Sequence, residues 1–89
     1  MNNEINPIED DFNAALSRYK AGQDLIPIVQ DFQKIIQQIP NHFAAWTCIS
    51  WLQLLLKNNE EALAAARHAV RLNQQDPQAR MNLSLALLA

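Results

Sequence analysis

Apolar residues recur every three or four positions along most of this chain, the spacing that gathers them on one face of a helix. The pattern follows a polar start that extends to about Ile8. It predicts helices over residues 9–21, 24–39, 41–56, 59–71 and 76–89. The sequence therefore predicts an all-α fold of about five helices.

A glycine, two prolines and an aspartate mark the boundaries of the first two predicted helices. Gly22 is expected to end the first, because glycine adopts the left-handed backbone conformation without penalty. Asp24 is a candidate N-cap for the second, and Pro27 falls in its first turn, where the missing N–H costs nothing. Pro40 is expected to end this helix.

Polar residues separate the remaining helices. Asn41 is expected to cap the third helix and Asn59 the fourth. Lys57 suits the end of the third helix, where the helix dipole is negative. Asp76 followed by Pro77 predicts the start of the fifth helix, with aspartate as the N-cap and proline in the first helical position.

The third and fourth predicted helices differ in how their apolar residues are distributed. The third is apolar nearly all round, so we expect neighbouring helices to cover both of its sides. The fourth has one face of small apolar residues, whereas its other face carries Arg67, His68 and Arg71. We expect these three side chains to form a solvated surface.

Composition and charge exclude several classes of function. One glycine in 89 residues is too few for the glycine-rich loops that bind nucleotide phosphates. A net charge of -2 provides no basic face for nucleic acid or anionic lipid. No apolar run approaches the roughly 18 residues that span a bilayer, and the start is unlike a signal peptide. With the single Cys48, these features predict a cytoplasmic protein without nucleic-acid binding or membrane insertion.

Candidate catalytic and metal-binding residues are isolated in the sequence. Cys48 lies mid-helix among apolar neighbours and is expected to be a buried structural thiol. His42 and His68 have no potential metal ligand three or four residues away, so they are expected to be capping or surface residues. Paired carboxylates occur only at predicted helix starts, where the helix dipole explains them. The sequence therefore predicts a protein that is not an enzyme and has no cofactor or metal.

A 34-residue period relates the predicted helices. Shifting the sequence by this length superimposes Ala15 on Ile49 and Ile49 on Leu83. In the central unit, the small residues Ala62 and Ala69 occur where two helices would pack closely. In this period and in these residues the chain resembles the tetratricopeptide repeat family.

The resemblance implies a right-handed α-solenoid of stacked antiparallel helix–turn–helix repeats. It divides the chain into a flexible segment 1–8, a degenerate repeat 9–40, a second repeat 41–75 and the first helix of a third repeat 76–89. In the degenerate repeat, Ile28 and Ile35 replace small residues, so bulkier contacts are expected there. The implied repeat core comprises Phe12, Tyr19, Phe32, Trp46, Ile49, Ala62, Ala69 and Leu83.

The family also implies a function in protein or peptide binding through a concave groove. Here the groove would be mainly apolar, because the basic residues that clamp a peptide carboxylate in some members are missing. Trp51 is expected to anchor a partner, although packing in the core is an alternative. The implied groove residues are Asn13, Ser17, Lys20, Thr47, Trp51, Leu55, Met81 and Leu85.

Two further functions stay open at this stage. The leucine-rich fifth helix suggests an array truncated at its end, and two copies of the chain could cover this surface as a homodimer. The chain would then be a self-associating structural scaffold. By resemblance alone, it could also be an assembly factor for a multisubunit complex, as are the tetratricopeptide proteins that assemble photosystems.

Overall fold

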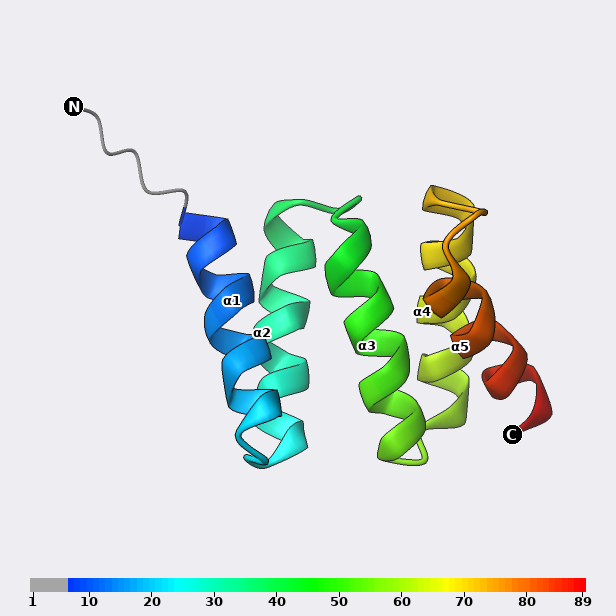
Figure 1. Ribbon diagram of the computed structural model, residues 1–89, viewed down its shortest axis with the longest axis horizontal. Helices are drawn as coiled ribbons and strands as arrows, with labels where there is room; N and C mark the ends of the chain where they lie inside the picture. Colours follow the sequence, from blue (N-terminus) through cyan, green and yellow to red (C-terminus); the bar gives the residue numbers. More distant parts are fainter. Residues whose placement is uncertain (1–6) are drawn as a thin grey trace.

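The computed structural model describes residues 7–89, which form five α-helices (Figure 1). The helices are α1 Pro7–Lys20, α2 Leu25–Gln38, α3 Phe43–Leu55, α4 Asn59–Leu72 and α5 Pro77–Leu88. Residues 7–89 contain no strand, which confirms the all-α fold class. The predicted flexible segment lies outside the described residues up to position 6, whereas Pro7 and Ile8 already belong to α1.

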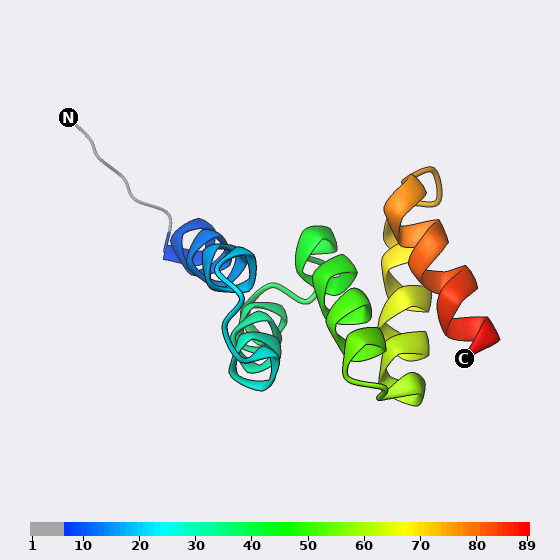
Figure 2. The ribbon, with the colours of Figure 1, turned by 60° about the horizontal axis from the view of Figure 1, so that its bottom comes forward.

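The helices lie side by side in an elongated row that measures 49 × 28 × 21 Å (Figures 1 and 2). Each helix packs against the next one in the chain, and α3 also packs against α5. In Figure 2 the first two helices are seen more nearly end-on than the last three, so the helix axes turn along the row. Both α2 and α4, and both α3 and α5, begin 34 residues apart.

Left-handed residues end two of the helices. At the end of α1, Gly22 has a φ of 77°, and its N–H donates to the carbonyl of Tyr19 at 3.0 Å. This confirms the predicted glycine stop. Lys57 ends α3 in the same way with a φ of 65°, and its N–H donates to the carbonyl of Leu54 at 3.1 Å. Lys57 therefore accepts a backbone conformation that is strained for any residue except glycine.

Two predicted N-caps are confirmed and two are wrong. Asp24 and Asp76 each accept a hydrogen bond from a backbone N–H in the first turn of their helices, α2 and α5. The cap of α3 is His42 rather than Asn41, because the imidazole Nδ1 accepts from the N–H of Ala45 at 3.1 Å. Asn58 takes the cap position of α4, but its side-chain amide donates instead to Gln53 Oε1 at 2.8 Å.

The core lies mainly between α1, α2 and α3. Its buried residues are Ala15, Ile28, Val29, Phe32, Ile35, Ala45, Ile49, Leu52 and Ala65. Phe32 is at the centre, 1% exposed, and the Phe12 ring meets it edge-on with the ring centroids 5.4 Å apart. The two bulky residues of the degenerate repeat, Ile28 and Ile35, are fully buried there.

The residues expected in the repeat core differ in how deeply they are buried. Four are buried, namely Phe32, Ile49, Ala62 and Ala69. Phe12, Tyr19 and Trp46 are half-buried and pack against the core, and Leu83 is also half-buried. Buried alanines, not large side chains, therefore make up the inner face of α4.

Ala69 has no exposed surface, so a larger side chain there must displace its neighbours. We expect Ala69→Leu to lower the free energy of unfolding by about 1–3 kcal/mol through overpacking. Urea denaturation followed by circular dichroism measures this change. Ala64→Leu is the matched control, because Ala64 is exposed on the same helix. Equal stability of the two variants would contradict the close packing of α4.

The polar face predicted for the fourth helix is only partly solvated. Arg67 and Arg71 are exposed as expected. His68, however, is half-buried and packs on Trp46, with the ring centroids 4.2 Å apart. The indole N–H of Trp46 points the other way along the chain and donates to the carbonyl of Pro40 at 2.7 Å. The expectation for His68 was wrong because an aromatic side chain of α3 extends over this part of α4.

Candidate binding groove

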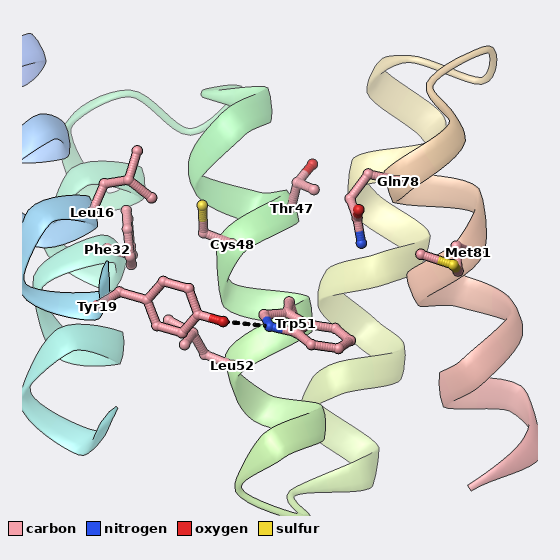
Figure 3. Close-up of a pocket in the computed structure, with 9 residues that line it drawn as sticks. All are labelled: Leu16, Tyr19, Phe32, Thr47, Cys48, Trp51, Leu52, Gln78 and Met81. Carbon is pink, nitrogen blue, oxygen red and sulfur yellow. Dashed lines mark hydrogen bonds between the residues drawn. The ribbon is translucent and has the colours of Figure 1, made fainter. Parts of the chain in front are cut away.

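A groove of about 280 Å³ opens between α1, α2, α3 and α5 (Figure 3). The residues that line it are Leu16, Tyr19, Phe32, Thr47, Cys48, Trp51, Leu52, Gln78 and Met81. Four of them lie on α3, which forms the middle of the groove, while α5 supplies Gln78 and Met81. No charged side chain lines this groove.

The lining is apolar at the base and polar at a few defined atoms. Phe32 and Leu52 are 1% and 2% exposed, so they form a fixed floor. Tyr19 and Leu16 form the α1 wall, and Met81, which is 50% exposed, lies at the α5 rim. A ligand with apolar side chains would thus exchange water for a preformed hydrophobic surface.

A hydrogen bond between Trp51 and Tyr19 crosses the groove. The indole Nε1–H donates to the tyrosine hydroxyl oxygen at 2.9 Å, and this bond joins α3 to α1 (Figure 3). The hydroxyl hydrogen of Tyr19 is not used in this bond and can be donated to an acceptor on a ligand. The pair therefore both braces the groove and offers it one polar contact.

A buried polar network fixes α5 against α3 beside the groove. Asn82 is fully buried, and its Nδ2 donates to Ser50 Oγ at 2.9 Å and to the carbonyl of Thr47 at 3.2 Å. Its Oδ1 accepts from Gln78 Nε2 at 2.8 Å. Because Thr47 and Gln78 both line the groove, the network sets the spacing of its two sides.

Cys48 is half-buried in the groove wall, so the expectation of a fully buried thiol was wrong. Burial raises the pKa of its thiol to about 11, because the charged thiolate loses its hydration. The thiol is therefore protonated at neutral pH. Since the thiolate is the reactive form, Cys48 is a weak nucleophile in this groove.

The raised pKa of Cys48 predicts slow alkylation. At pH 8 we expect iodoacetamide to modify the folded protein about 100-fold more slowly than the urea-unfolded chain, since the pKa rises from 9.0 to about 11. The same pKa difference should lower stability as the pH rises above 9, because the unfolded thiol ionises first. Mass spectrometry of timed samples measures the rate. Equal rates in the two states would contradict the desolvated thiol.

The predicted groove residues are only partly brought together. Thr47, Trp51 and Met81 line the groove. Leu55 and Leu85 line an adjoining hollow between α3 and α5, and Trp51 separates the two.

The residues predicted on α1 lie elsewhere. Asn13 faces a different hollow with Phe12 and His42, and Ser17 and Lys20 are exposed without contributing to the groove lining. Leu16 and Tyr19 take the places expected for them. The prediction failed because the register of the second repeat was carried onto the degenerate first one. The helical spacing of Phe12, Leu16 and Tyr19 was the available signal.

The part of the chain described here contains no group of three or more histidine, cysteine, aspartate or glutamate side chains that could hold a metal ion. The same part contains no helix both long and apolar enough to cross a membrane. Neither a protein-family model nor a curated protein sequence matches the chain.

Proposed function

We propose that this chain is a tetratricopeptide-like repeat module that binds a segment of another protein in the groove between α1, α3 and α5. Its biochemical role is then binding rather than catalysis. The observation that carries the proposal is the groove itself, a preformed apolar surface without a charged side chain.

The repeat interpretation is supported by equivalent positions that recur on one side of the molecule. Thr47 and Met81 are 34 residues apart and both line the groove. Trp51 and Leu85 are also 34 residues apart and both line the adjoining hollow. The contact between α3 and α5 is the one that stacked repeats require of their first helices.

The size and chemistry of the groove favour a protein segment as the ligand. Small-molecule sites typically enclose about 300–1,000 Å³, so a groove of about 280 Å³ suits one or two apolar side chains. The backbone of such a segment could accept the free hydroxyl hydrogen of Tyr19. The protonated thiol of Cys48 and the uncharged lining offer no general acid, general base or strong nucleophile.

The proposal is tested by placing one charge on either side of α5. Met81→Glu introduces a carboxylate at the groove rim, whereas Leu87→Glu introduces it on the other side of the helix. Both positions are at least half exposed, so both variants are expected to fold. Proteins that copurify with the wild-type chain should be lost with Met81→Glu and kept with Leu87→Glu. A set of partners unaffected by Met81→Glu would contradict the groove as the binding site.

Self-association is a second candidate function, favoured by an exposed apolar stripe. Met81, Leu85 and Leu88 recur at helical spacing on α5, with exposed fractions of 50%, 40% and 84%. Two copies could bury these stripes against each other. Sedimentation over a concentration series distinguishes this function, since a dimer that Leu85→Glu dissociates would support it and a monomer at high micromolar concentration would exclude it.

A further inference from the structure

A second apolar hollow lies at the far end of the row, between α4 and α5. We define the end face by its lining residues Val70, Arg71, Gln74, Gln75, Arg80, Leu83, Ser84 and Leu87. None of these residues lines the groove, so α5 presents two different faces to two different hollows. Leu87 was expected to pack against the preceding helices, but it is 58% exposed on this face.

The end face differs from the groove in its charge. Arg71 and Arg80 line it, and both are exposed. Arg71 contacts His68 Nδ1 at 3.3 Å, and within residues 7–89 neither guanidinium pairs with a carboxylate. The apolar centre made by Val70, Leu83 and Leu87 is thus bordered by two uncompensated positive charges.

We propose that the end face binds an amphipathic helix of a partner protein, whose apolar stripe is flanked by acidic residues. Side chains of a helix can pack into the furrow between two adjacent helices, here α4 and α5. Leucine-sized residues would cover Val70, Leu83 and Leu87, and the flanking carboxylates would pair with Arg71 and Arg80.

A second copy of this chain does not supply such a helix from its described residues. The large exposed apolar residues lie on α2, α3 and α5 and in the turn after α2. The carboxylates of α1 and α4 lie on helices that have no large exposed apolar residue. On α2, the side chain of Asp31 is already paired with Arg18. The acidic helix must therefore come from a different protein.

Two matched peptides test the proposal. Each is a helical peptide of about 15 residues with a leucine stripe, flanked by glutamates in one and by lysines in the other. Binding of the labelled peptides to the whole chain is measured by fluorescence anisotropy. We expect the glutamate peptide to bind at least about fivefold more tightly, and more weakly as salt is added, because two ion pairs at a partly exposed rim contribute modestly and are screened.

Three variants assign the site. The double charge reversal Arg71→Glu and Arg80→Glu should reverse the preference toward the lysine peptide. Leu87→Ala should weaken binding of the glutamate peptide, while Met81→Ala, at an exposed position on the groove side of α5, should leave it unchanged. These changes are all at exposed positions, so circular dichroism should show an intact fold.

Three results would overturn the proposal. The first is equal binding of the lysine and glutamate peptides, and the second is the absence of binding by either at millimolar concentration. The third is a dimer of the chain that Leu87→Glu dissociates, since the end face would then be covered by a second copy.

Discussion

Replacing Phe32 with alanine should lower the free energy of unfolding by about 3–5 kcal/mol, the largest effect expected for one substitution in this chain. Phe32 is 1% exposed and contacts the edge of Phe12, so the variant loses both hydrophobic burial and an aromatic pair. In a protein of this size, each kcal/mol shifts the melting temperature by about 4–8 °C. Thermal unfolding followed by circular dichroism measures the effect.

Ile26→Ala is the control for this experiment, because Ile26 is on the same helix but 55% exposed. It should change the stability by a small fraction of the Phe32→Ala effect. Similar losses in both variants would mean that α2 does not direct Phe32 into the core. Because Phe32 also forms the groove floor, Phe32→Ala should weaken groove binding even where the fold persists.

Asn82→Ala is expected to lower the free energy of unfolding by about 2–3 kcal/mol. The substitution removes three hydrogen bonds at a fully buried position, and each net bond contributes about 0.5–1.5 kcal/mol. Urea denaturation measures the loss. Gln78→Ala is the matched control, because it removes only the exposed member of the network. Equal effects of the two variants would show that the buried bonds contribute little.

The local structure could largely be predicted from the sequence. Helical spacing, Gly22, and the aspartates Asp24 and Asp76 placed the helices within a few residues of their observed limits. These signals work because helix ends depend on backbone hydrogen bonds that nearby residues satisfy. The caps of α3 and α4 were missed because histidine is an uncommon cap and because Asn58 bonds to Gln53 instead.

The candidate site could be predicted only in part. Periodicity shows which residues share a face of a helix, but it does not show which neighbouring helix covers that face. Thr47, Trp51 and Met81 were found because α3 and α5 follow the same register. Tyr19 was missed because its partner Trp51 is 32 residues away in the sequence, and His68 was misjudged because Trp46 of another helix covers it.

The main contacts of each helix are with helices one or two places away in the chain. Folding such a chain requires only short loops to close, so its relative contact order is low and folding within milliseconds is expected. Units held only by neighbours can also open from either end without disturbing the middle. The α1–α2 pair, joined to the rest mainly through α2, could therefore separate while α3, α4 and α5 stay packed. The groove, which needs the α1 wall, would then exist only while that pair is docked.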